Sequence, residues 1–578
     1  MEPSPIDFRA RPFVCGALGV VAPDRLARLH RAVPGLTTVH EATGVVLLAN
    51  APLSPYRVDG PVRAWAFGDR SPAPTDDWQA AAVAAEAPGL VDDGDQVVLH
   101  SGALGFIDLF TRYLGDALWF ASRIEPLVSL DPAPLDVDWE AWASVIVFHC
   151  PSGDKTPFQA VRRLQGSRMH ILDRATRRIR SERWSPPWHG LDSVDQDAGD
   201  PVEIMERLRD TMRGMQPVPY ALALSGGYDS RLVAIAARDV GTDMTAWSTS
   251  KDDGRDDVPI TRDLAALLDL ELRYVDPSAV PYPVAGEEVR DRTGGMVAMH
   301  TWMGPLGAAL RSNGQPVLTD TIGGVLIGGA NITAEMLVQP PGRARLIALR
   351  TQVERPPIIG KTLAETAVPW IMDTAHASWL AAVRHLEGDA NGLVLSTIET
   401  RDTRGIITMP MWLFGPEVRV ETPTSRPEMI LAALAVGIRR KARGAFSQEV
   451  LAAADPVAGT LRTSHDRRPA LAGVVGHKAT PEALAWLRAD IEQARAVPGL
   501  VPDGLLRYLE LGRWAGPNRR DALLRRPRRP RPGAFEGAQM TNYARLGLPL
   551  AHLGAWIEGN RHRLSSIEPP WRTTIRRR

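Results

Sequence analysis

The sequence has few cysteines and few lysines, and it carries no net charge. Its 578 residues include two cysteines, Cys15 and Cys150, which are too few for a disulfide framework or a cysteine zinc site. Lysine plus arginine and aspartate plus glutamate each total 67, so no overall charge favours nucleic acid or a membrane surface. Nearly all of the positive charge is arginine, because the lysines are only Lys155, Lys251, Lys361, Lys441 and Lys478.

Long hydrophobic runs are also missing. The opening residues, MEPSPIDFRARPFV, contain no apolar signal core. The sequence also lacks an uncharged apolar run of about 18 residues, the length that could cross a bilayer. The small number of cysteines suits a reducing compartment, so we expect a cytoplasmic protein with no membrane span. A chain of 578 residues exceeds what one hydrophobic core usually serves, so we expect at least two domains.

The chain changes character after its first third. From FVCGALGVV to RSERWSP, short apolar runs broken by Gly, Pro and Asp predict mainly β-strands. Residues 185–201, SPPWHGLDSVDQDAGDP, predict a linker. Beyond it, strand-like and helical patterns alternate, as in α/β domains, and one helical face is marked by Ile204, Leu208, Met212 and Met215. We therefore predict an α/β fold with a mainly β N-terminal domain.

The stretch YALALSGGYDSRLVAIAARD, residues 220–239, predicts a strand, a glycine turn and a helix. The first N–H groups of a helix have no partner within the helix and bind anions, and glycines let phosphate oxygens approach the main chain. An ordinary glycine-containing turn is the alternative for this motif alone. The nucleotide reading assigns phosphate contacts to Ser225, Gly226, Gly227, Tyr228, Asp229 and Ser230.

The neighbouring stretches favour the nucleotide reading. MTAWSTS and ELRYVD predict the next two strands of a βαβαβ unit, whose ligand site lies at the carboxyl ends of the strands. Ser248 in the first of them is a further expected nucleotide contact. A carboxylate beside phosphates is the expected Mg²⁺ ligand, so ATP and Mg²⁺ are the predicted cofactors, with Asp229 as a metal ligand. RPPIIGKT is not a Walker A motif, because Arg355 stands where the first glycine belongs.

LSGGYDSRL resembles the pyrophosphate loop of the ATP pyrophosphatase (PP-loop) group, in the form found in asparagine synthetase and its relatives. One stretch before this loop and two after it resemble parts of the same family, in the family's order along the chain. TPFQAVRRLQGSRMHILD resembles the end of its glutaminase-like domain, PVLTDTIGGVLIGG its second glycine-rich loop, and RDTRGIITMPMWLFGPEVRVETP the helix and turn that close the synthetase site. The resemblance covers roughly residues 10–470.

The resemblance implies a domain plan and a reaction. An N-terminal glutaminase-like (Ntn-type) sandwich is expected at residues 1–190, and a doubly wound parallel-sheet ATP-binding domain at 200–515. An arginine-rich C-terminal extension is expected at 516–578. The implied reaction cleaves ATP to AMP and pyrophosphate, with a carboxylate adenylated and then attacked by an amine.

Cys15 bears on the source of that amine. Glutamine-using members of the family begin with a nucleophilic cysteine whose free α-amine is the base. VCGALGV resembles that start, but Cys15 lies fourteen residues inside the chain. We expect a buried structural cysteine, with trimming of the chain to Cys15 as the alternative. The family's Asn-Gly glutamine-binding signature is also missing, so we expect the substrate to supply the amine.

Two branches use one molecule for both carboxylate and amine: β-lactam-type synthetases and lasso peptide cyclases. Abundant tryptophan and arginine, and an overall likeness to the cyclases, favour a lasso peptide cyclase. It would adenylate an Asp or Glu side chain of a leaderless precursor peptide, and the peptide's N-terminal amine would close a macrolactam. A separate leader peptidase and leader-recognition protein are the implied partners. The alternatives are a β-lactam synthetase-like or asparagine synthetase-like ligase on a small molecule, and a non-catalytic nucleotide- or peptide-binding homologue.

The chain departs from the family at several site positions. Gly324 stands where the second loop usually carries an acidic Mg²⁺ ligand; Asp320 either replaces it or merely ends a strand. The lysine that stabilises the leaving pyrophosphate is replaced in GTLRTSHDRRP, where Arg462 is our candidate. Glu417, in the Glu-x-Arg turn with Arg419, is either a structural ion pair or a catalytic base. Further basic candidates are His465, Arg467, Arg468, Lys441 and Lys478.

Overall fold

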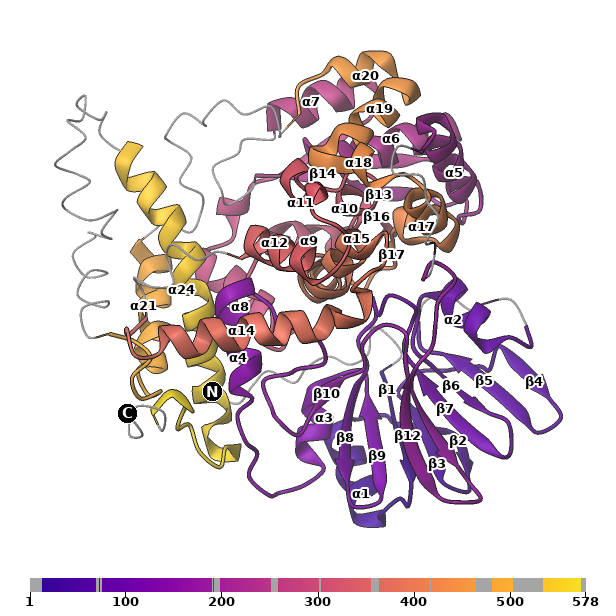
Figure 1. Cartoon of the computed structure of the whole chain (residues 1–578), viewed down its shortest axis with the longest axis vertical. Helices are drawn as coiled ribbons and strands as arrows, with labels where there is room; N and C mark the ends of the chain where they lie inside the picture. The colour runs from indigo at the N-terminus through magenta and orange to yellow at the C-terminus, as the bar shows by residue number, and fades with distance from the viewer. Residues whose placement is uncertain are drawn as a thin grey trace.

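The computed structural model shows a mixed α/β chain. It describes residues 13–572 except 69–71, 73–74, 190, 192–197, 251–257, 301–302, 355–362, 416, 464–480 and 503–533. Within these residues there are two antiparallel sheets and one parallel sheet. The antiparallel sheets use residues 14–183 and the parallel sheet residues 220–421 (Figure 1). The α/β expectation is confirmed at this level, whereas the domain boundaries near residues 190 and 515 stay predictions.

The N-terminal part is mainly β-strand, as its sequence pattern predicted. The first six-stranded sheet has the order β10-β8-β9-β1-β3-β2, and the second has the order β12-β11-β7-β6-β5-β4. The strands are β1 (Val14–Gly19), β2 (Thr37–Ala42), β3 (Val45–Ala49), β4 (Arg57–Asp59), β5 (Val62–Ala66), β6 (Gly89–Asp92), β7 (Gln96–His100), β8 (Phe110–Leu114), β9 (Ala117–Ala121), β10 (Arg162–Arg163), β11 (Arg168–Asp173) and β12 (Arg178–Arg183).

Strand β1 is buried along its whole length, and its two faces pack into different cores. Val14 and Leu18 belong to a cluster that includes residues of both antiparallel sheets, such as Leu90 of β6. Cys15 and Ala17 point the other way, into the large core that also contains the helices. This alternation follows from the two-residue period of a strand. Cys15 is therefore a fully buried strand residue, as expected.

The parallel sheet has the order β15-β14-β13-β16-β17, and every neighbouring pair in it is parallel. Each strand therefore ends at the same edge. The three strands predicted from YALAL, MTAWSTS and ELRYVD are present, and PVLT supplies a fourth. The strands are β13 (Tyr220–Ala223), β14 (Met244–Thr249), β15 (Leu272–Val275), β16 (Val317–Leu318) and β17 (Val420–Glu421).

Helices surround the parallel sheet and connect it to the rest of the chain (Figure 1). Helices α1 (Pro23–Ala32), α2 (Trp78–Ala85) and α3 (Ile124–Ser129) lie with the antiparallel sheets instead (Figure 1). The other helices of the first half are α4 (Trp139–Phe148), α5 (Pro201–Arg213), α6 (Tyr228–Asp239), α7 (Val258–Leu267) and α8 (Tyr282–Arg292). Those in the second half are α9 (Met303–Asn313), α10 (Gly323–Leu326), α11 (Ala334–Val338), α12 (Arg343–Val353), α14 (Val368–Val383), α15 (Gly392–Thr397), α16 (Thr408–Leu413), α17 (Pro427–Leu434), α18 (Ile438–Lys441), α19 (Ala445–Ala454), α20 (Pro456–Thr460), α21 (Pro481–Ala494) and α24 (Ala534–Asn560).

A nine-residue π-helix, η3 (Ile398–Ile406), lies between α15 and α16. Helices of this kind are rare and mostly short. Short 3₁₀ turns are η1 (Pro277–Ala279), η2 (Arg384–Leu386), η4 (Pro423–Ser425), η5 (Ala442–Gly444) and η7 (Arg561–Arg563). The helix predicted after the linker is present as α5, with Ile204, Leu208 and Met212 buried on one face, and it ends before Met215.

The last described residues, 547–572, are part of the main core. The second half of α24 packs along α21, and it also contacts α4 of the N-terminal part. Trp556 packs against Trp142 at a ring-centroid distance of 5.3 Å, and Leu564 forms a parallel bridge with Leu135. Trp571 is buried between Trp139 and Trp370. The described part of the expected C-terminal extension therefore buries apolar side chains and joins sequence-distant segments, a property that its arginine content did not predict.

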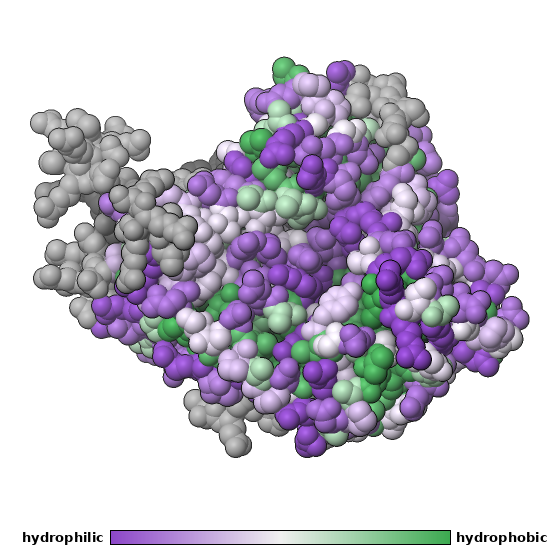
Figure 2. Space-filling model, turned by 60° about the horizontal axis from the view of Figure 1, so that its bottom comes forward, coloured by the Kyte–Doolittle hydropathy of each residue, from purple (hydrophilic) through white to green (hydrophobic). Residues whose placement is uncertain are grey.

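Hydrophobic side chains on the face shown in Figure 2 gather in several separate patches within a largely hydrophilic surface. The large hydrophobic residues that are most exposed come from distant parts of the chain, among them Val20, Val202 and Val338. None of the described helices is both long enough and apolar enough to cross a membrane.

Candidate functional site

The turn after β13 is held closed by two serines. Ser225 N–H donates to Ser230 Oγ at 3.1 Å, and the two hydroxyl oxygens lie 2.9 Å apart. The Ser230 hydroxyl also donates to the Ser225 carbonyl at 3.1 Å, and Gly227 N–H donates to Ser225 Oγ at 3.3 Å. Both predicted serine contacts therefore shape the loop, and this fixes the main chain that would face a phosphate.

The loop leads directly into α6, as the sequence predicted. Gly227 precedes the helix with an extended backbone, φ −81° and ψ 178°, which any residue can adopt. The glycine is useful here because it lacks a side chain at the start of a helix, where N–H groups bind anions. Tyr228, the first helical residue, is half-buried near Gly444. The geometry leaves the main chain of the turn suited to an anion.

Asp229 lies against the second glycine-rich stretch. A methyl group built on Gly324 would come within 2.7 Å of Asp229 Oδ2. Real Cβ atoms essentially never approach other atoms so closely, so a larger residue at position 324 would displace the Asp229 carboxylate. This contact gives a physical reason for the glycine at the position where the family usually carries an acid.

Asp320 follows β16 at the same edge of the parallel sheet. Its carboxylate accepts hydrogen bonds from Gly323 N–H at 3.2 Å and from the Thr424 hydroxyl. Burial raises the pKa of Asp320 to about 6, although the hydrogen bonds from Thr424 and Gly323 lower it. Asp320 thus accepts hydrogen bonds at the start of α10, and its carboxyl group is half-buried.

Asp229 and Asp320 are brought together by consecutive glycines. A methyl on Gly323 would lie 2.8 Å from Asp320 Oδ1, just as one on Gly324 would meet Asp229. Within the described ranges, no group of three or more His, Cys, Asp or Glu side chains could hold a metal. Two carboxylates nevertheless suit Mg²⁺, which commonly takes one or two from the protein and the remaining ligands from water and phosphate. The donor set therefore fits a Mg²⁺–nucleotide and not a closed metal centre.

Ser248 occupies the neighbouring strand β14. It is buried, and in the described part of the chain its hydroxyl has no hydrogen-bond partner. A buried hydroxyl without a partner costs free energy, so a ligand that bonds to it would remove that cost. Ser248 lies near the carboxyl end of β14, and β14 runs parallel to β13 beside it. Ser248 is therefore at the same edge of the sheet as the loop.

The basic candidates fall in different settings. Arg462 is exposed and follows α20, and its carbonyl accepts a hydrogen bond from Arg231 of α6 at 2.8 Å. Lys441 is fully buried, donates to the Ala433 carbonyl at 2.6 Å, and has its pKa lowered to about 7 by burial. Arg462 is therefore the better placed cation for an anionic ligand. The other candidates, His465, Arg467, Arg468 and Lys478, lie outside the described residues.

Glu417 is not brought together with the two aspartates. Its carboxylate pairs with Arg292 at 2.8 Å and lies 3.9 Å from Arg311. Val420 and Glu421 of β17 pair with Val317 and Leu318 of β16 in parallel. Glu417 therefore precedes β17 at the amino end of the strand, whereas Asp320 follows β16 at the carboxyl end. Of the two readings that the sequence left open, this placement favours the structural ion pair.

Sequence reasoning missed Thr424 and Arg231. Thr424 lies three residues beyond the end of β17 and donates to Asp320, so the order of β16 and β17 in the sheet was needed to find it. Arg231 follows the loop by one residue and has no exposed surface, and its guanidinium donates to carbonyls within residues 458–462. In the sequence it reads as an ordinary surface position of a helix.

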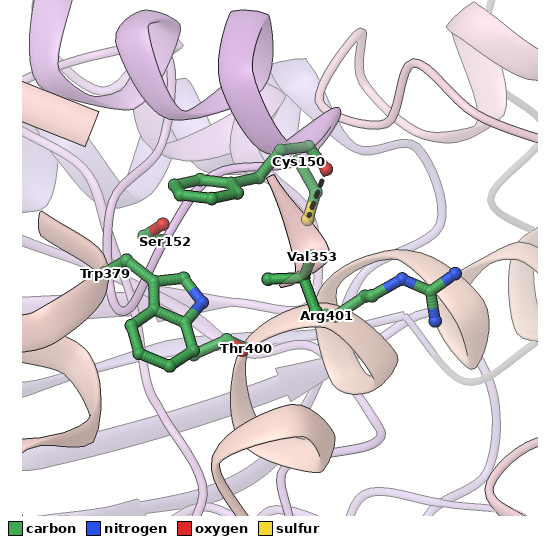
Figure 3. A pocket seen from close by; sticks show the side chains of 7 residues that line it. Cys150, Ser152, Val353, Trp379, Thr400 and Arg401 are labelled. Atoms are coloured by element: carbon green, nitrogen blue, oxygen red, sulfur yellow. Dashed lines mark hydrogen bonds between the residues drawn. The ribbon is translucent and has the colours of Figure 1, made fainter. Parts of the chain in front are cut away.

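A separate pocket lies where the end of α4, α12, α14 and η3 meet (Figure 3). It holds about 260 Å³ of space, including open solvent, and Cys150, Ser152, Trp379 and Thr400 are among its lining residues. The Cys150 thiol donates to the Phe148 carbonyl, and burial raises its pKa to about 11. The thiol therefore stays protonated near neutral pH, and none of the predicted nucleotide contacts lines this pocket.

Comparison with known proteins leaves the family open. No family model matches the sequence, and no curated protein matches it either. Twenty-two chains of solved structures match. One is glutamine phosphoribosylpyrophosphate (PRPP) amidotransferase from B. subtilis, complexed with ADP and GMP, which is 10% identical and has a TM-score of 0.18. The match covers 46% of this chain and 81% of that chain. A likeness this distant supports no statement about activity, ligands or partners.

Proposed function

We propose that this chain is an ATP-dependent, AMP-forming amide ligase that closes a macrolactam in a leaderless lasso-type precursor peptide. The observation that carries the proposal is the meeting of the Ser225–Ser230 turn, Asp229 and Asp320 around Gly323 and Gly324. An anion-binding helix start beside two carboxylates suits a triphosphate with its cation. The peptide and the ring closure rest on the sequence resemblance.

The proposed reaction has two steps. An oxygen of a peptide Asp or Glu carboxylate attacks the α-phosphorus of ATP, and pyrophosphate leaves with the electrons of the broken P–O bond. The peptide's N-terminal amine then attacks the acyl carbon and loses a proton, and AMP leaves as the C–N bond forms. Adenylation is needed because a free carboxylate does not react with an amine at a useful rate.

Each protein group has one task in this scheme. The main chain at the start of α6 binds the phosphates, while Ser225 and Ser230 keep the turn in shape. Asp229 and Asp320 would hold Mg²⁺, whose charge neutralises the phosphate oxygens when it is bound. Arg462 would stabilise the leaving pyrophosphate, because a guanidinium can meet two phosphate oxygens at once. A separate leader peptidase and a leader-recognition protein would supply the leaderless peptide.

The test combines the purified chain with candidate leaderless peptides, ATP and Mg²⁺. Pyrophosphate release that depends on the peptide, together with loss of one water from the peptide mass, is the expected result. Pyrophosphate release with a small amino acid instead would indicate the small-molecule ligase. Nucleotide binding without pyrophosphate release under every condition would indicate a binding protein and contradict the proposal.

Replacing Cys15 by alanine should leave ring closure unchanged, and glutamine should not be hydrolysed by either protein. The thiol is fully buried on β1, and burial raises its pKa well above its usual range, so it is a poor nucleophile. Mass spectrometry of the product and an assay for glutamate are the measurements. Glutamate that forms from glutamine in the parent and not in Cys15→Ala would contradict this prediction.

Replacing Asp320 by asparagine should lower kcat and raise the Mg²⁺ concentration needed for half-maximal rate. Asparagine keeps the size and an oxygen that can accept from Thr424 and Gly323, while it removes the charge. Parental kcat and Mg²⁺ dependence in the variant would assign Asp320 to a structural role.

The same substitution has a second readout in stability. Because folding raises the pKa of Asp320 from 3.8 to about 6, the ionised carboxylate is less favourable in the folded chain than in the unfolded one. Its contribution to stability is therefore greatest below pH 4 and declines as the pH rises to about 6. Without nucleotide, Asp320→Asn should be more stable than the parent at pH 7 to 8, as measured by thermal unfolding, and this advantage should shrink toward pH 4.

A further inference from the structure

Helix α20 is held along α6 by two arginines. Arg238 donates to Asp455 Oδ2 at 2.8 Å, and Asp455 caps the start of α20 by accepting from Val457 N–H and Ala458 N–H. At the other end, Arg231 donates to the carbonyls of Ala458 at 2.7 Å, Leu461 at 3.1 Å and Arg462 at 2.8 Å. The two arginines are seven residues apart, so they lie on the same face of α6.

These carbonyls compensate in part for a setting that is unfavourable for the charge of Arg231. The residue has no exposed surface, and a cation in the first turn of a helix is opposed by the helix dipole. Carbonyls at the end of another helix offset both costs, because they carry partial negative charge and accept hydrogen bonds. The contact is therefore specific to an arginine that can reach several carbonyls at once.

Arg231 also directly follows the residue that closes the phosphate loop. Ser230 bonds to both the N–H and the carbonyl of Ser225, so neighbouring residues of α6 hold the loop on one side and the start of the Arg462 segment on the other. A small shift of the first turn of α6 would therefore move both the Ser225–Ser230 turn and the segment that contains Arg462.

We propose that Arg231 is a positioning residue that couples the phosphate loop to Arg462, setting where that side chain stands relative to a bound triphosphate. The effect on a bound triphosphate rests on the proposed ATP chemistry. The claim that Arg231 fixes residues 458–462 does not depend on that chemistry. In this role Arg231 acts through Arg462 and does not itself touch the nucleotide.

The first experiment needs no activity. Hydrogen exchange is measured by mass spectrometry on the full-length chain, in a peptide covering residues 456–463, for the parent, Arg231→Met and Arg231→Lys. Arg112→Met is the matched control, since Arg112 is also a buried guanidinium that donates to carbonyls near the end of a helix, those of Leu127 and Val128. Exchange at 456–463 should be about tenfold faster in Arg231→Met and unchanged in Arg112→Met. Arg231→Lys serves if the methionine variant fails to fold.

The second experiment uses pyrophosphate release. Arg231→Lys should lower kcat by about tenfold with KM for MgATP within about threefold, because the loop serines stay in place. Arg462→Gln should cost about as much alone, yet add less than about twofold in the Arg231→Lys background, since the two changes remove the same interaction.

The outcomes separate the two claims. Additive losses in the double variant, or equal exchange at 456–463 in the parent and Arg231→Met, would overturn the inference. If the parent releases no pyrophosphate with any substrate, the proposed function fails, while the exchange comparison still decides whether Arg231 holds the Arg462 segment. An Arg112→Met control that changes the same peptide by the same factor would also overturn the inference, because the effect would then be general loosening.

Discussion

Replacing Asp229 by alanine is expected to reduce ATP cleavage to the background rate. Asp229 is in the first turn of α6, within the Ser225–Ser230 turn to which we assign phosphate binding, and its carboxylate lies against Gly324. Without it, Asp320 would be the one remaining ligand that we propose for Mg²⁺, so the cation that offsets the phosphate charge would be held less firmly. A loss of about 4 kcal/mol in transition-state stabilisation corresponds to roughly a thousandfold fall in kcat/KM. The measurement is pyrophosphate release at saturating Mg²⁺.

Asp210→Ala is the control for this change. Asp210 is an exposed acid on α5, the helix that packs beside α6, and it pairs with Arg213 on its own helix. Its removal should leave turnover within about twofold, because exposed i to i+3 pairs contribute little. Turnover of Asp229→Ala within threefold of the parent would remove the metal assignment, and an equal fall in both variants would point to misfolding.

Replacing Trp571 by alanine is expected to be the most destabilising change in the C-terminal region. The side chain is only 2% exposed, it packs edge-on against Trp139 at 5.5 Å, and it lies 5.3 Å from Trp370. Its Nε1–H donates to the Pro498 carbonyl at 3.3 Å. Truncating a buried tryptophan to alanine costs about 3–5 kcal/mol in the free energy of unfolding, which equilibrium urea unfolding would measure.

Trp571→Phe should recover most of that loss. Phenylalanine keeps a ring between Trp139 and Trp370, although it gives up the hydrogen bond to Pro498. If Trp571→Ala unfolds at the same urea concentration as the parent, residues near 571 do not contribute to the core in solution. If phenylalanine is no better than alanine, the hydrogen bond and not the ring packing carries the effect.

Short-range patterns predicted the parallel sheet and the turn well. YALAL, the two glycines and the spacing of Leu232, Val233, Ile235 and Ala236 defined β13, the loop and α6, because each depends on residues close in sequence. The same holds for Cys15, whose apolar neighbours already indicated a buried strand. The position of Asp320 at a strand end could also be predicted from PVLT.

What the sequence could not provide is the order of elements in space. Thr424 reaches Asp320 because β17 lies beside β16, and Glu417 falls at the opposite end of β17, yet neither follows from local periodicity. Arg231 looks like a helix surface residue until α20 covers it. The prediction for the C-terminal extension was based on its arginines. Its packing depends instead on the apolar residues within 547–572, since burial of apolar surface contributes more free energy than exposed charges do.

The packing of the last described residues against the N-terminal part has a consequence for synthesis of the chain. Ser565 bonds to Asp136, a separation of 429 residues, and Trp571 fills a space beside Trp139. At about 5–20 residues per second, a ribosome needs roughly 20–90 s to make the intervening chain. During that time part of the apolar surface of Trp139 and Trp142 stays exposed to solvent. We therefore expect nascent chains stopped before residue 547 to bind chaperones that recognise exposed aromatic surface, and chains that include residue 571 to be released from them.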